Sequence, residues 1–165
     1  QLNNGAFDDP RCHLFFEDGQ KFLENTQNNY DLILVDSSDP IGPNAVLFDH
    51  PFYTLCQKAL GDKGLLVTQN SVCFLQKENL KHSYDRLKKH FNQVCFYQAD
   101  VPSYIGGRMS LSFSSQAPVY HQRTLADIEN VFDTAQIQTR YYTPKMHIAS
   151  FTLPRYIEQS LEGAT

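Results

Sequence analysis

Apolar residues follow two patterns that alternate along the chain. Short stretches that are mostly apolar are typical of strands, and they occur at residues 13–17, 32–35, 64–69 and 94–99. Apolar residues at helical spacing predict helices between these runs, at residues 20–25, 51–60 and 77–91. Strands that alternate with helices form a parallel sheet covered by helices, so the pattern predicts a parallel α/β sheet with right-handed crossovers.

The last third of the chain departs from this alternation. Residues 109–114 alternate as a strand that can pair antiparallel with residues 94–99, across the turn-rich loop 100–107. Helical patterns follow at residues 125–135 and 155–161, and an aromatic stretch at 141–144 separates them. We therefore expect an antiparallel hairpin near the C-terminal part of the sheet.

Size and charge narrow the class of protein. A chain of 165 residues with 41% hydrophobic content can bury one substantial core, so we expect one folded unit. A net charge of −4 gives no basic surface for nucleic acid and suits a small cationic ligand. No apolar run approaches the roughly 20 residues of a membrane span, and no cationic-then-apolar leader opens the chain.

The four cysteines indicate the compartment. Each lies beside apolar neighbours and none forms a Cys-x-x-Cys pair, which predicts reduced, buried thiols and a cytoplasmic location for Cys12, Cys56, Cys73 and Cys95. The chain opens with Gln1 instead of methionine, so we expect a piece of a longer protein.

The strongest candidate for chemistry lies after the run Leu32–Val35. This run is continuous, which predicts a strand buried on both faces, and ligands of parallel sheets bind beyond the carboxyl ends of the strands. Asp36 and Asp39 follow in a loop rich in Ser and Pro. Two such carboxylates can attract an alkylammonium or accept its proton, but they can also bond local backbone N–H groups as turn residues.

Three other positions have two interpretations each. Asp18, before Gly19, could accept an amine proton of a nucleobase or could simply end a strand in an Asp-Gly turn. Tyr104 could close over an apolar ligand or pack against the hairpin. Gln69 and Asn70 end another strand at the same rim, where polar residues are usual.

Other chemistries lack their motifs. The six histidines show no HExxH or comparable ligand spacing, so we expect no metal site. The sequence contains no serine nucleophile elbow, no catalytic Cys/His signature, no phosphate-binding loop and no G-x-G-x-x-G.

Taken together, these motifs resemble one enzyme family. The segment from Asp31 to Pro43 reads DLILVDSSDPIGP, and it is accompanied in order by Asp8-Asp9-Pro10-Arg11, Asp18-Gly19, Gln69-Asn70, Pro102-Ser103-Tyr104, Gly106-Gly107 and Tyr141-Tyr142 with His147. The sequence thereby resembles the spermidine synthases, or polyamine aminopropyltransferases, of the proteobacterial type. These enzymes transfer an aminopropyl group from decarboxylated S-adenosylmethionine to putrescine and produce spermidine and methylthioadenosine.

The resemblance implies roles for particular residues. Asp36 would be the proton acceptor, and the diamine would lie against Asp36, Ser37, Ser38, Asp39 and Tyr104. The nucleoside pocket would include Asp18, Gly19 and Pro43, with Gln69 as a lesser candidate. Decarboxylated S-adenosylmethionine would be a co-substrate, so no cofactor is implied.

The family's N-terminal β-structured region, its Gly-rich loop and the acids that hold the donor have no counterpart here. The resemblance implies that residues 1–165 are the C-terminal part of a single Rossmann-like α/β catalytic domain of the S-adenosylmethionine-methyltransferase type. Its sheet would have helices on both faces and would lack its N-terminal half. The parent protein would be a homodimer or homotetramer. Two alternatives are a catalytically incomplete fragment that needs the missing region and an S-adenosylmethionine-dependent methyltransferase.

Overall fold

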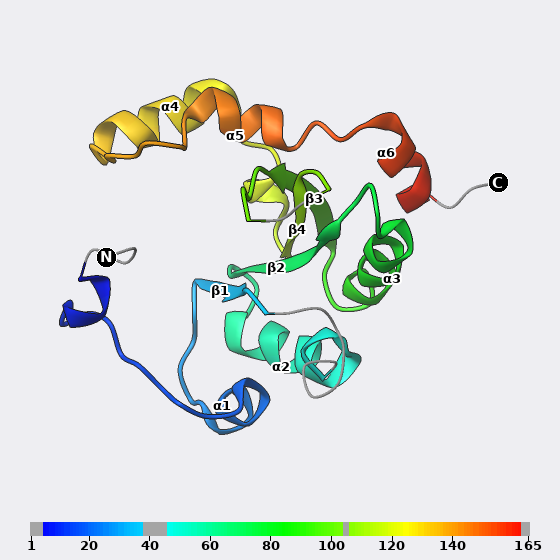
Figure 1. Cartoon of the computed structure of the whole chain (residues 1–165). Coiled ribbons are helices and arrows are strands. Elements are labelled where there is room, and N and C mark those ends of the chain that lie inside the picture. The colour runs from blue at the N-terminus through cyan, green and yellow to red at the C-terminus, as the bar shows by residue number, and fades with distance from the viewer. Residues whose placement is uncertain (1–4, 38–45, 104–105, 163–165) are drawn as a thin grey trace.

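A four-stranded sheet forms the centre of the fold (Figure 1). The computed structural model describes residues 5–37, 46–103 and 106–162. The strands are β1 (Leu32–Val35), β2 (Leu65–Val72), β3 (Gln93–Ala99) and β4 (Met109–Ser115), in the spatial order β1-β2-β4-β3. β1 and β2 are parallel, whereas β4 is antiparallel to both β2 and β3. The predicted α/β class and the predicted β3–β4 hairpin are confirmed.

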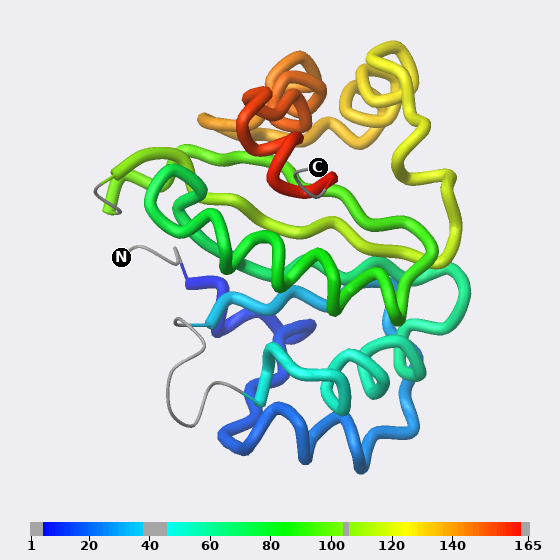
Figure 2. Tube along the Cα trace, turned by 90° about the vertical axis from the view of Figure 1, so that its right-hand side faces the viewer, coloured from blue at the N-terminus to red at the C-terminus, as the bar shows by residue number. Residues whose placement is uncertain are grey.

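Helices surround this sheet. They are α1 (Gly19–Asn25), α2 (His50–Leu60), α3 (Lys77–Leu87), α4 (Leu125–Thr134), α5 (Pro144–Ser150) and α6 (Arg155–Glu162), with short 3-10 turns at Ala6–Asp8 and Pro118–Tyr120. In Figure 2 the strands run side by side, with α1 and α2 at the β1 end and α4 and α5 at the β3 end, while α3 lies in front of the sheet.

Local side chains fix where several helices begin. Asp18, Asp49, Thr124 and Thr143 each occupy an N-cap, where a side-chain oxygen accepts a backbone N–H of the first turn. Such a cap contributes about 1 kcal/mol to helix stability. The Thr124 cap is reciprocal, because the side chain of Asp127 also accepts from the Thr124 backbone N–H.

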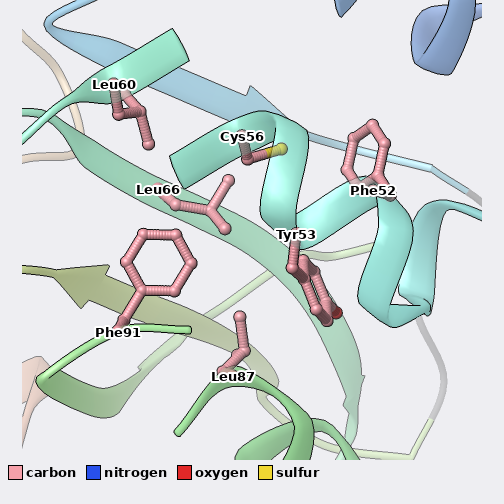
Figure 3. Packing of buried hydrophobic residues seen from close by; sticks show 7 residues of the cluster. All are labelled: Phe52, Tyr53, Cys56, Leu60, Leu66, Leu87 and Phe91. Carbon is pink, nitrogen blue, oxygen red and sulfur yellow. The ribbon is translucent and has the colours of Figure 1, made fainter. Parts of the chain in front are cut away.

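Two hydrophobic clusters hold helices α2, α3 and α6 against one face of the sheet. The larger joins α2, β2 and the α3 region through Phe52, Tyr53, Cys56, Leu60, Leu66, Leu87 and Phe91 (Figure 3). The smaller joins α3, β3 and α6 through Leu80, Phe96, Ile157 and Cys73. On the opposite face, the ring of Phe151, which directly follows α5, contacts the rings of Tyr97 on β3 and Phe113 on β4.

The prediction of a strand at residues 13–17 was wrong. These residues form no strand, and Leu14, Phe15 and Phe16 are exposed by 51%, 63% and 94%. A strand of this length needs a neighbour for its backbone hydrogen bonds, and the described residues provide none at this position.

The expectation that Leu32–Val35 is buried on both faces was also wrong. Ile33 and Val35 pack against the α2 cluster, whereas Leu32 and Leu34 are 46% and 66% exposed. Within the described part of the chain β1 pairs only with β2, so it is an edge strand. Its face that carries Leu32 and Leu34 is not covered by any helix that the structure describes.

Two features of the C-terminal region were not anticipated. β4 pairs with β2 as well as with β3 and lies between them, whereas only its pairing with residues 94–99 was expected. Helix α5 was missed because its seven residues carry little apolar periodicity, although Thr143 and Pro144 form a usual helix start.

The structure gives the state of the four cysteines and the extent of the helices. All four cysteines are free thiols, with Cys56 and Cys73 buried and Cys12 and Cys95 partly buried. Burial raises the pKa of the Cys56 and Cys95 thiols to about 12. None of the described helices is long and apolar enough to cross a membrane.

Replacing Gly64 with alanine should destabilise the fold. A Cβ atom at this position would lie 2.6 Å from Leu60 Cβ and 2.7 Å from the Leu60 backbone oxygen, where the chain passes from α2 into β2. Because the backbone atom cannot move independently of the helix, the free energy of unfolding should fall by about 1–3 kcal/mol. Urea unfolding of Gly64→Ala measures this, with Lys63→Ala on the exposed neighbour as the control. An unchanged urea midpoint for Gly64→Ala would contradict the close contact between position 64 and Leu60.

Acid should destabilise the protein partly through His90. His50 Nδ1 and His90 Nε2 share a hydrogen bond of 2.8 Å, so at most one ring can readily carry the second proton. Burial, with smaller contributions from His50 and Lys89, lowers the pKa of His90 below its ordinary value of 6.5. The unfolded chain therefore binds the proton more readily, and stability present above pH 6.5 is lost as the pH falls through the lower folded value.

Urea unfolding at about pH 7.5 and about pH 5.5 tests this linkage. The loss of unfolding free energy between the two conditions should be smaller in His90→Gln than in the native sequence. An equal loss in both would show that the acid sensitivity arises elsewhere, for example at His121 or His147, whose pKa values are also lowered by burial.

Candidate functional site

The candidate site is built at the carboxyl end of β1. The strand ends at Val35, and Asp36 follows with an exposed side chain. β1 pairs with β2 in a register that places Val35 opposite Thr68. The next residue of each segment is Asp36, just after β1, and Gln69, within β2, and the register brings these two side by side.

Gln69 holds the loop after β1. With its amide oriented so that the nitrogen faces the acceptors, Gln69 donates to Asp36 Oδ1 at 2.8 Å and to the Ser37 backbone oxygen at 2.7 Å. Gln69 is only 7% exposed, so this amide is fixed by its surroundings. The hydrogen bonds orient the Asp36 carboxylate without neutralising its charge, because an amide carries none.

An apolar cavity of about 390 Å³ adjoins Asp36. Gly19, Asp36 and Ser37 line it together with apolar side chains of α1, β1, α2 and the segment before α2, among them Phe22, Leu34, Phe52 and Leu47. A carboxylate at the rim of such a cavity can attract an ammonium group and accept a proton from it. The structure therefore brings together four of the predicted site residues, namely Gly19, Asp36, Ser37 and Gln69.

Asp18 has a structural role that the turn interpretation partly anticipated. It is the N-cap of α1, and its Oδ1 accepts from the backbone N–H groups of Gln20 at 2.9 Å and Lys21 at 3.1 Å. Its second oxygen accepts no hydrogen bond from the residues that the structure describes, so capping leaves one carboxylate oxygen available.

Four predicted site residues lie outside the described ranges. They are Ser38, Asp39, Pro43 and Tyr104.

The aromatic motif near the C-terminus serves a different part of the fold. The Tyr142 hydroxyl and His147 Nδ1 lie 3.2 Å apart, and the Tyr141 hydroxyl accepts from the Asp100 backbone N–H at 3.0 Å. Tyr141, Tyr142 and His147 line a cavity of about 220 Å³ between α5 and the sheet. The Tyr141 hydrogen bond joins the segment before α5 to the end of β3, and none of the three residues lines the cavity beside Asp36.

The Asp36–Gln69 contact was underestimated from the sequence, in which Gln69 was only a lesser candidate. The signal was the pairing of neighbouring parallel strands, because Val35 lies opposite Thr68 and the next residues are Asp36 and Gln69. The expectation that Gln69 and Asn70 end their strand was wrong, since β2 continues to Val72. For metal binding, no group of three or more His, Cys, Asp or Glu side chains within the described ranges is arranged to hold an ion.

Comparison with known proteins gives a consistent result. The profile of the spermine/spermidine synthase domain matches residues 1–124. Two curated relatives named polyamine aminopropyltransferase, from Yersinia pestis (strain Pestoides F) and Yersinia pseudotuberculosis serotype O:1b (strain IP 31758), are each 42% identical over 157 residues. The match covers 95% of this chain and 53% of each relative, so the chain spans about half the length of these proteins.

Solved structures resemble the chain over nearly its whole length. A spermidine synthase in complex with the transition-state analogue AdoDATO superposes with a TM-score of 0.85 at 28% identity, over 97% of this chain and 54% of that one. Spermidine synthase from Thermotoga maritima gives a TM-score of 0.82 at 28% identity, over 97% of this chain and 53% of that one. On its sequence and its fold, the chain belongs to the spermine/spermidine synthase family.

Proposed function

We propose that this chain carries the amine-activating part of a spermidine synthase, which transfers an aminopropyl group from decarboxylated S-adenosylmethionine to putrescine. The observation that carries the proposal is the Asp36 carboxylate, which Gln69 fixes at the rim of an apolar cavity. The family membership and the spermidine synthase likeness support this choice of reaction. Residues 1–165 would form the C-terminal part of one catalytic domain of a cytosolic enzyme.

The reaction requires a base beside the amine. The amines of putrescine are largely protonated near neutral pH, as a lysine of pKa about 10.4 is, so the attacking nitrogen must first lose a proton. Asp36 attracts the ammonium and accepts that proton. The nitrogen lone pair then forms a bond to the aminopropyl carbon attached to the sulfonium, and the carbon–sulfur bond breaks with its electron pair passing to sulfur. Methylthioadenosine leaves as a neutral thioether.

The other residues position the two substrates. Ser37 would lie beside the diamine, with Ser38, Asp39 and Tyr104 proposed to complete that side. Gly19 lines the cavity that Asp36 adjoins, and the free oxygen of Asp18 would accept from the nucleoside, with Pro43 beside it. Holding the amine and the sulfonium carbon in line would provide much of the rate. The donor is a co-substrate, and the proposal involves no cofactor or metal.

Replacing Asp36 with asparagine should abolish most of the turnover. Asparagine keeps the size of the side chain but cannot accept the proton, so release of methylthioadenosine should fall by about 10²–10⁴-fold. The assay supplies putrescine and decarboxylated S-adenosylmethionine to the 165-residue chain joined to the part of the Yersinia pestis relative outside the matched region. Asp31→Asn, which changes an acid just before the same strand, is the matched control.

Two results would contradict the proposal. One is an Asp36→Asn variant as active as the native sequence. The other is transfer of a methyl group from S-adenosylmethionine in preference to aminopropyl transfer, which would identify a methyltransferase.

Replacing Gln69 with leucine tests the positioning of Asp36. Leucine fills a similar volume but removes both hydrogen bonds to the loop after β1. Because the carboxylate then samples other orientations, kcat should fall about tenfold, the equivalent of one hydrogen bond to a charged group. Gln57→Leu on α2 is the control for adding an apolar side chain, and thermal unfolding verifies that both variants fold. A reduced thermal midpoint with an unchanged kcat would assign Gln69 to stability alone.

A further inference from the structure

A pair of histidines links the start of α2 to the segment after α3. His50 is the first residue of α2, and His90 follows shortly after α3, which ends at Leu87. Their facing ring nitrogens, His50 Nδ1 and His90 Nε2, are 2.8 Å apart. Neither residue lines the cavity beside Asp36, so the pair has no part in the proposed aminopropyl transfer.

The hydrophobic core holds the two segments that carry these histidines. Tyr53 on the first turn of α2 and Phe91, which directly follows His90, belong to the same buried cluster (Figure 3). Gln116 Nε2 also donates to the His90 backbone oxygen at 2.7 Å. The side chains of His50 and His90 are themselves only partly buried, so solutes reach them from solvent. The pair is therefore an accessible group on fixed backbone, which is what a preorganised binding site requires.

The hydrogen-bond network assigns the tautomers of both rings. The Thr54 hydroxyl donates to the His50 backbone oxygen at 3.0 Å, so its hydrogen is not available to His90. At a longer distance of 3.5 Å, the same hydroxyl oxygen then accepts from His90 Nδ1. This leaves the lone pair of His90 on Nε2, where His50 Nδ1 donates to it. One proton thus lies between two imidazole nitrogens that both favour metal ions as ligands.

The separation of the two nitrogens suits a single metal ion. Two imidazoles that bind one ion through bonds of about 2.0 Å place their nitrogens about 2.8 Å apart at a right angle and about 3.3 Å apart at a tetrahedral angle. The observed 2.8 Å lies at the short end of this range. Binding requires only that each ring turns its nitrogen toward the ion and that the proton between them passes to solvent.

The chemistry of the pair selects the class of ion. Imidazole nitrogen suits zinc, nickel and copper, whereas calcium and magnesium prefer oxygen ligands. Within the described ranges no third His, Cys, Asp or Glu completes a cluster, so water fills the other positions on the ion. The expectation of no metal site rested on ligand spacing in the sequence, and two histidines that are 40 residues apart form no such motif.

We propose that His50 and His90 bind one divalent transition-metal ion of the zinc and nickel class. His50 Nδ1 and His90 Nε2 are the protein ligands, and Thr54 orients His90 through its other ring nitrogen. The ion replaces the shared proton and joins the start of α2 to the segment after α3. It therefore stabilises the packing of these two segments in addition to the core beneath them.

The proposal is tested by calorimetric titration of the 165-residue chain with Ni²⁺ at about pH 7.5, where an ordinary histidine is neutral. The native sequence should bind one ion saturably in the micromolar range. His50→Gln and His90→Gln should each weaken this binding by about tenfold or more, and Thr54→Val should weaken it by about tenfold through the orientation of His90.

The exposed His82 on α3 provides the matched control. His82→Gln removes one histidine outside the pair, so its affinity for Ni²⁺ should equal that of the native sequence. Thermal unfolding supplies a second measurement that also verifies folding. Saturating Ni²⁺ should raise the midpoint of the native sequence and of His82→Gln, but not that of His50→Gln.

Three outcomes would overturn the proposal. Absence of saturable Ni²⁺ binding would mean that the two rings form a hydrogen-bonded pair only. Unchanged binding in the double variant His50→Gln/His90→Gln would place the ion elsewhere, for example at Cys95 and His121, whose Sγ and Nδ1 are 3.1 Å apart. Equally tight binding of Mg²⁺ would identify carboxylates, and not imidazoles, as the ligands.

Discussion

The need to satisfy polar groups in a buried strand governs much of this structure. β2 is a central strand, and every residue from Leu66 to Val72 is buried. Four consecutive residues of this stretch are polar, namely Thr68, Gln69, Asn70 and Ser71. A buried polar side chain without a partner costs several times what a completed hydrogen bond contributes, so each of these groups requires a specific neighbour.

Those requirements link the core to the candidate site. Thr68 Oγ1 and Ser112 Oγ lie 2.7 Å apart and join β2 to β4, while Gln69 reaches across to the loop after β1. Both links depend on strand register, because a shift by one residue would turn each side chain to the other face of the sheet. Asn70 is the member of this run whose buried oxygen finds no partner among the residues that the structure describes. The strand that organises the core therefore also orients the candidate base Asp36 through Gln69.

The sequence predicts the parts of this fold that depend on local pattern. The β3–β4 hairpin and helices α2, α3, α4 and α6 follow from periodicity and turn residues alone. The segment at 13–17 and the exposed face of β1 do not, because whether Phe16 or Leu34 is buried depends on which other segments pack there. The position of β4 between β2 and β3 is likewise a property of the whole sheet, and the pattern of residues 109–114 is compatible with either neighbour.

The candidate site divides in the same way. Asp36 is identified by its place after an apolar run, but its contact with Gln69 becomes evident only from the β1–β2 register. This contact has a chemical consequence. An arginine or lysine at position 69 would orient the carboxylate and also cancel its charge, which would remove its attraction for an ammonium group. A buried amide donates the same hydrogen bond while the carboxylate keeps its full negative charge. The arrangement thus separates orientation of the base from its electrostatics, which is what a residue that attracts an ammonium and then takes its proton requires.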